Sequence, residues 1–244
     1  MLRSVKSIQG YSVQTTDGTI GHVDDVYFDD VKWTIRHLVV ETGSCLNNRK
    51  VLITPFALDR TNWATRTLTV RMSTEKVKNS PLVDTDRPIS RQHEAEYFDY
   101  HSWPYYWAAS GMWGGSPGMM MPALASLESE RSRSQAQPGR APNHPPGDCH
   151  LRSAREVIGY HMHATDGEMG HVDDFVADDE SWRIRYMVVD TSNWWLGKKI
   201  LIAPEWVTAV RWLDRMAVVS LPREIIKQSP AWNLEIPISP QYEK

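Results

Sequence analysis

The residues best suited to chemistry form a His-Val-Asp-Asp motif that occurs twice, at residues 22–25 and 171–174. Imidazole and carboxylate groups bind transition metals and also serve as general acids or bases. One copy supplies too few ligands for a closed zinc site, which takes four, so a metal site would have to use both copies. The six candidate metal ligands are His22, Asp24, Asp25, His171, Asp173 and Asp174.

A structural role for the same motif competes with metal binding. On an extended strand His22 and Asp24 share one face, while Asp25 points to the other. Asp25 is then placed to accept backbone N–H groups at a β-bulge, or to pair with Arg36, as Asp174 would with Arg185. The sequence favours this structural role, and a metal-binding protein or hydrolase that uses the repeated motif stays as an alternative.

Two further acidic pairs, Asp29-Asp30 and Asp178-Asp179, precede tryptophans. A calcium loop needs more oxygen ligands at alternate positions, so we expect a solvated turn at each pair. No nucleophile lies near them, and the chain has no Ser-His-Asp order, phosphate loop or dinucleotide fingerprint. The sequence therefore assigns no catalytic residue, predicts no cofactor and favours a protein that is not an enzyme.

The motif belongs to a longer internal repeat. Residues 16–25, TDGTIGHVDD, return 149 positions later as TDGEMGHVDD. At this offset the match runs without a gap from Ser4 and Ser153 to Pro81 and Pro230, and roughly 30 of the 78 aligned pairs are identical. The chain is a tandem duplication, so we expect one domain over residues 1–90 and a second over residues 151–244.

Each copy is predicted to be a small β-domain. Asp17-Gly18 indicates a hairpin turn, and the spacing after Val23 indicates a bulge near Asp24-Asp25. The strand predicted at residues 33–42 is apolar on both faces near its end, so it needs cover on two sides. A helical turn is expected at residues 73–78 and at 222–227. Five or six short strands predict an all-β fold of two tandem, closed, antiparallel β-barrels, each with a short C-terminal helical turn.

The segment between the copies differs in composition. Residues 91–125 form an aromatic and methionine-rich extension that opens with a predicted short helix at residues 91–100, and residues 126–150 are rich in Ser, Arg, Pro and Gly, as in flexible linkers. The sequence leaves three roles open for the aromatic residues here and in the second copy: packing within the chain, binding a protein partner, or contact with a membrane surface. The candidate partner-binding residues are Trp103, Tyr105, Tyr106, Trp107, Trp113, Trp194, Trp195 and Trp206.

Composition narrows the function classes. The net charge of −3 shows no excess of basic residues of the kind that binds nucleic-acid phosphates. The proportions of 41% hydrophobic and 23% charged residues are ordinary for a globular protein. Cys45 and Cys149 suggest neither a disulfide framework nor a thiolate site. The start of the chain lacks the apolar core of a signal peptide, and no 18 consecutive residues are apolar. We therefore expect a cytoplasmic protein without a membrane span.

The order of these features resembles the PRC-barrel family, named for the cytoplasmic domain of the H subunit of photosynthetic reaction centres. The resemblance covers both repeats, about two thirds of the chain. It implies a β-barrel that mediates association, and the free-standing bacterial members are the most similar class, because neither an N-terminal membrane helix nor a separate RNA-factor domain precedes the barrel. The residues that carry it are Asp17-Gly18, Gly21, Val23, Asp25, Trp33, Ile35-Arg36, Val39-Val40, Leu52-Ile53, Pro55 and Ser80-Pro81, with the same set at 166–230.

The sequence thus predicts a non-enzymatic assembly or adaptor protein that acts through protein–protein contacts. We expect the two barrels to form an internal pseudo-dimer, since a duplication can imitate within one chain the two-fold dimer of single-barrel relatives. The identity of the protein partner and any homo-oligomer stay open. A peripheral membrane protein related in role to the reaction-centre H subunit is the second alternative.

Overall fold

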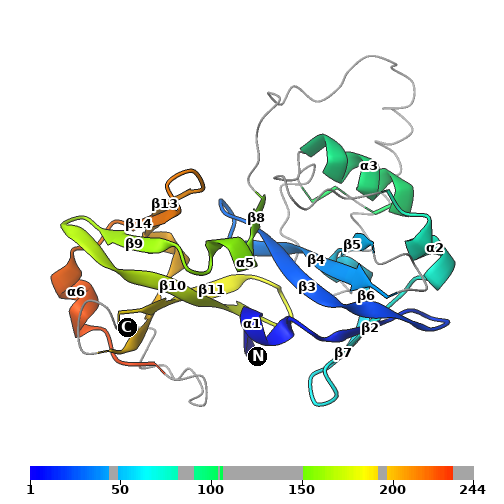
Figure 1. Cartoon of the computed structure of the whole chain (residues 1–244), viewed down its shortest axis with the longest axis horizontal. Coiled ribbons are helices and arrows are strands. Elements are labelled where there is room, and N and C mark those ends of the chain that lie inside the picture. Colours follow the sequence, from blue (N-terminus) through cyan, green and yellow to red (C-terminus); the bar gives the residue numbers. More distant parts are fainter. Residues whose placement is uncertain (44–48, 82–90, 104, 107–150, 192–196, 233–244) are drawn as a thin grey trace, which may run out of the picture.

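The computed structural model describes residues 1–43, 49–81, 91–103, 105–106, 151–191 and 197–232. The fold is mostly β. Two seven-stranded sheets, one for each repeat, lie along the long axis of the molecule, with the helices α1 (Val5–Ile8) and α5 (Ala154–Val157) between them (Figure 1). The two halves of the described chain therefore have the same topology, as the repeat predicts.

The first sheet has the order β5-β4-β3-β2-β7-β6 and the second the order β12-β11-β10-β9-β14-β13. In each sheet the long strand that carries the His-Val-Asp-Asp motif, β3 or β10, takes an additional short strand on its side. The strands of the first sheet are β2 (Ser12–Gln14), β3 (Thr19–Asp29), β4 (Thr34–Thr42), β5 (Lys50–Ile53), β6 (Leu58–Asn62) and β7 (Thr67–Val70). Those of the second are β9 (His161–Ala164), β10 (Gly167–Asp178), β11 (Ile184–Asp190), β12 (Lys199–Ile202), β13 (Val207–Arg211) and β14 (Met216–Val219).

The prediction of closed, fully antiparallel barrels needs correction. The strands β2 and β7 run parallel, as do β9 and β14, and among the described strands the ends of each path do not pair with each other. The chain passes from β5 to β6 through a 3-10 turn, η2 (Pro55–Ala57), and from β12 to β13 through η4 (Pro204–Trp206). Proline cannot donate to a ladder, so hydrogen bonding is interrupted at this corner.

The bulge predicted beside the motif is confirmed. The pairing of β3 with β4 shifts register between Val23 and Asp25, and that of β10 with β11 between Val172 and Asp174. A glycine precedes each bulge because the partner strand approaches closely: a Cβ atom on Gly21 would lie 2.0 Å from the carbonyl oxygen of Glu41. The repeated glycine is therefore a packing requirement of the β-ladder.

The strand predicted at residues 33–42 begins one residue later in the structure, at Thr34 of β4. Trp33 has φ 50° and Trp182 φ 57°, so both lie in the left-handed region and outside the extended strand. The short helices α2 (Thr74–Lys78) and α6 (Arg223–Gln228) follow the last strands, and Ser73 Oγ accepts a hydrogen bond from the Lys76 amide at 3.3 Å.

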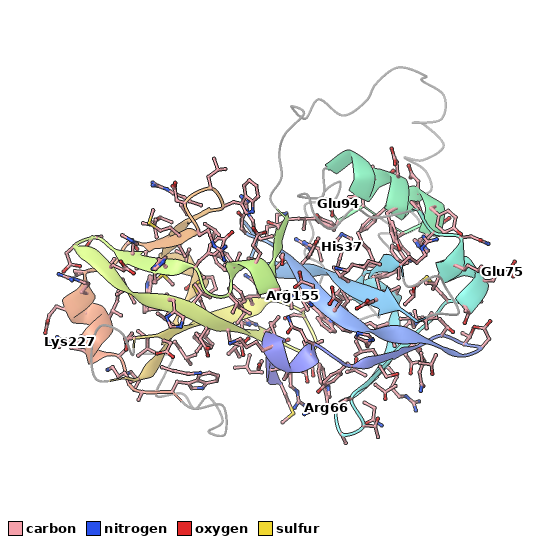
Figure 2. All side chains as sticks on the ribbon, in the orientation of Figure 1. His37, Arg66, Glu75, Glu94, Arg155 and Lys227 are labelled. Atoms are coloured by element: carbon pink, nitrogen blue, oxygen red, sulfur yellow. The ribbon has the colours of Figure 1, made fainter. Side chains whose placement is uncertain are left out.

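The helix α3 (Arg91–His101) covers part of the first sheet. His37 of β4 is fully buried, and its Nε2 lies 2.9 Å from Glu94 Oε1 of the helix (Figure 2). The Tyr97 hydroxyl accepts from the Leu52 amide of β5 at 3.0 Å. All but one residue of β4 are buried, so the two-sided cover expected for this strand is confirmed.

The docking of α3 should depend on pH through His101. Its ring is buried and stacks on Trp103 with centroids 4.2 Å apart, and neither ring nitrogen has a hydrogen-bond partner among the described residues. Burial, helped by Lys76, lowers the pKa of His101 to about 4. Because the folded-state pKa lies below that of the unfolded chain, the stabilisation is complete above pH ~6.5 and is lost as pH falls toward 4.

We therefore expect the free energy of unfolding in urea to fall by on the order of 2 kcal/mol between pH 7 and 4 on account of this group. The variant His101→Phe isolates the effect, since all other groups titrate in both proteins. A variant with the same pH slope as the parent chain would contradict the assignment.

Candidate functional site

The repeats exchange their first strands. The strand β1 (Leu2–Ser4) pairs with β10 of the second repeat, and β8 (Leu151–Ser153) pairs with β3 of the first. The two exchanged segments occupy equivalent positions in the alignment of the repeats. The helices that follow them cross over as well, because α1 packs on β10 and α5 on β3 (Figure 1).

Asp25 receives the exchanged segment on the first sheet. Ser153 donates its hydroxyl to Asp25 Oδ2, while the amides of Arg155 and Val26 donate to Oδ1 at 3.1 and 2.7 Å. The Ser153 oxygen also caps α5, because it accepts from the Glu156 amide at 3.0 Å. A carboxylate of one repeat thus fixes the helix start of the other.

Asp174 does the same in the opposite direction. Ser4 donates its hydroxyl to Asp174 Oδ2, and the amides of Lys6 and Phe175 donate to Oδ1 at 3.0 and 2.7 Å. Ser4 Oγ accepts from the Ser7 amide at 3.1 Å and so caps α1. Burial raises the pKa of Asp174, as it raises that of Asp25. We call these two sets of contacts, around Asp25 with Ser153 and around Asp174 with Ser4, the serine–aspartate latches.

The other aspartate of each motif forms one ion pair across the same junction and one within its own repeat. Asp24 Oδ1 lies 2.5 Å from Arg155 Nη2, and Asp24 Oδ2 lies 3.1 Å from Lys50 Nζ. Asp173 pairs with Lys6 at 2.9 Å and Lys199 at 2.7 Å. Burial alone would raise the pKa of Asp24, but the hydrogen bonds from Arg155 and Lys50 outweigh it and hold the pKa below its usual value.

The metal candidates are not brought together by these contacts. His22 is exposed, with its Nε2 3.5 Å from Glu41 Oε2. In the described ranges no three His, Cys, Asp or Glu side chains are grouped so that they could hold a metal ion. Of the two roles that the sequence left open for Asp25, it accepts backbone N–H groups, whereas Arg36 Nη2 lies 3.5 Å from Asp29 Oδ2.

The turn at Asp29 is as predicted, but it is not solvated. Asp29 is buried, and its Oδ1 accepts from the amides of Val31 and Lys32 at 3.0 and 2.9 Å. Asp178 makes the same kind of turn through the amide of Ser181 at 2.8 Å. Each aspartate therefore organises a turn through backbone hydrogen bonds.

The turns meet at the centre of the junction. The Ile35 amide donates to the Trp182 carbonyl, and the Ile184 amide to the Trp33 carbonyl, both at 2.8 Å. These two bonds flank an antiparallel bridge between Thr34 and Arg183, which are equivalent positions. Backbone pairing between the repeats is thus reciprocal here too.

The candidate partner-binding aromatics divide into three groups. Trp103 and Tyr106 are buried within the chain, where both contact the ring of Phe98, so neither presents a surface to a partner; Tyr105 is half-buried and donates its hydroxyl to Asp99. Trp206 is 41% exposed. Trp107, Trp113, Trp194 and Trp195 lie outside the described residues.

A cavity of about 610 Å³ lies at the junction and was not predicted from the sequence. It is lined by the turn and strand start at residues 30–36, by residues 183–185, by η4 and β13, and by Tyr106. Both repeats thus contribute to one cavity.

Neither a protein-family model nor a curated protein matches this chain. None of the helices in the described ranges has the length and apolar character needed to cross a membrane.

Proposed function

We propose that this chain is a non-enzymatic assembly or adaptor protein. In this proposal the two PRC-type domains form an internal pseudo-dimer, and the outer surface of this unit binds partner proteins. The cytoplasm is the compartment that we propose, since the cysteine content suggests no disulfide framework.

The observation that carries the proposal is the reciprocal exchange of β1 and β8, held by the two serine–aspartate latches. The repeated motif is the part of the sequence best suited to chemistry. Its buried carboxylates accept backbone and serine hydrogen bonds, and its outer carboxylates pair with lysine or arginine. This use of the motif favours assembly over catalysis, because a group saturated by structural contacts is poorly placed to act on a substrate.

Exposed apolar side chains of the second repeat favour a protein partner. Trp206, Trp212 and Leu213 are 41%, 43% and 87% exposed and belong to the second repeat. Their equivalents in the first repeat are Ala57, Trp63 and Ala64. Trp63 is only half-exposed, with the guanidinium of Arg3 4.7 Å above its ring. Exposed tryptophan is a typical anchor of protein interfaces, so we propose that the second repeat bears the partner surface.

The test is site-specific photo-cross-linking in cells of the source organism. A photoreactive phenylalanine analogue at Trp206 should give one discrete heavier adduct. The matched control is Ile225, which is 51% exposed and belongs to α6, the helix at the end of the molecule away from the first repeat (Figure 1). The absence of an adduct at Trp206, or the same adducts at both positions, would argue against an adaptor surface there.

A further inference from the structure

The lining of the junction cavity has more cationic than acidic side chains, although the chain as a whole has a net charge of −3. Its lining contains four cationic side chains, Lys32, Arg36, Arg183 and Arg185, against the two acidic side chains Asp30 and Glu205. Asp30 Oδ2 already lies 2.6 Å from Arg152 Nε. A concave site with an excess of one charge raises the local concentration of ligands of the opposite charge.

Arg36 places a buried guanidinium group in the lining of this cavity. Its side chain is 5% exposed, and the closest approach to its ion-pair partner Asp29 is 3.5 Å. The guanidinium carbon lies 4.0 Å from the ring centroid of Tyr106, and Nε has no hydrogen-bond partner among the described residues. A buried donor without an acceptor destabilises the fold, and an oxyanion in the cavity would supply the missing acceptor.

The two repeats contribute jointly to this charge. Arg36 and Arg185 are equivalent positions of the duplication, and both line the same cavity beside the Thr34–Arg183 bridge. Lining residues differ in charge from their equivalents in the other repeat; for example, Lys32 corresponds to Ser181, and Thr208 corresponds to Asp59. The segments equivalent to the cavity lining are therefore less basic than the lining itself. The duplication has diverged toward one basic site at the junction.

We infer that the cavity binds a small polyanionic molecule through its phosphate or carboxylate oxygens, with Arg185 and Lys32 as the exposed charges, Arg183 as a half-buried one and Arg36 as the buried one. Guanidinium groups match the geometry of both oxyanions, and a volume of about 610 Å³ is within the range of small-molecule sites. Because both repeats supply ligating groups, the ligand would also hold the junction together. This inference does not depend on the proposed adaptor function.

The test is calorimetric titration of the full chain with two probes, pyrophosphate and citrate, at low ionic strength. At least one probe should bind with a dissociation constant below about 1 mM and raise the thermal midpoint. Tighter binding of pyrophosphate would identify a phosphate ligand, and tighter binding of citrate a carboxylate ligand.

The variant Arg185→Gln, at an exposed lining position, should weaken binding about tenfold, and Lys32→Gln should act in the same direction. The matched control is Arg211→Gln, an exposed arginine of β13 outside the lining, which should leave the dissociation constant within about twofold. Absence of binding by both probes at about 10 mM, or equal weakening by Arg211→Gln and Arg185→Gln, would overturn the inference.

Discussion

Replacing Asp25 and Asp174 together with alanine is expected to lower the free energy of unfolding by about 4 kcal/mol or more. Each substitution removes the acceptor of two backbone amides and one serine hydroxyl. Both carboxyl groups are buried, so water cannot replace these acceptors without opening the junction. Urea unfolding at neutral pH measures the loss, and the two latches are separate, so their effects should be close to additive.

The matched control is the double asparagine variant. Burial raises the pKa of both carboxyl groups, so the charge itself is not what stabilises the fold, and an amide oxygen can accept the same two backbone N–H groups. We expect the asparagine variant to stay within about 1 kcal/mol of the parent chain. Equal losses for alanine and asparagine would mean that the latches depend on charge, against our account.

Changing the first strand should disturb the second repeat more than the first. When Leu2, Arg3 and Ser4 are replaced with three glycines, β10 loses its partner at Val176, Ala177 and Asp178. Hydrogen exchange at the Asp179 amide, which donates to the Met1 carbonyl, should accelerate at least about tenfold, whereas the Asp178 amide, which donates to the Arg183 carbonyl, should change less. The amides of β3 should change less.

The duplication offers the reciprocal experiment. Three glycines at residues 151–153 should accelerate exchange in β3 at Tyr27, Phe28 and Asp29 and leave β10 less affected. Acceleration confined in each case to the repeat that carries the substitution would rule out the exchange of strands.

Short-range features were accessible from the sequence because their causes are local. The bulge at Asp24 follows from the changed spacing of apolar residues, and Gly21 is required by a close approach within one sheet. The two-sided burial of β4 follows from its own pattern. The predicted helix at residues 91–100 agrees with α3 to within one residue because it depends on neighbouring positions.

Features that depend on distant partners were not accessible. The segments at residues 2–4 and 151–153 have the same sequence, Leu-Arg-Ser, and nothing in three residues tells which sheet they join. The identity of these three residues in the two copies shows that the segments are equivalent, but it does not show which sheet each one joins. The sequence left two roles open for Asp25, accepting backbone N–H groups or pairing with Arg36; the fold shows the first and places Arg36 beside Asp29.

The cavity was missed for a related reason. Arg36 and Arg185 are visible as equivalent positions, but they share a cavity because the Thr34–Arg183 bridge aligns the starts of β4 and β11. That alignment is a property of how the repeats dock, and a pattern within one repeat does not contain it.

The most direct test of the central claim, that the two repeats are held together by exchanged strands, is to cut the chain between them. A protease site inserted within residues 126–146 would be cleaved after folding, and the mass in solution would be measured by light scattering at micromolar concentration. We predict one particle with the mass of the intact chain, and its dissociation when Asp25 and Asp174 are both alanine. Two independent particles from the cleaved parent chain, each with about half of the mass, would contradict the account.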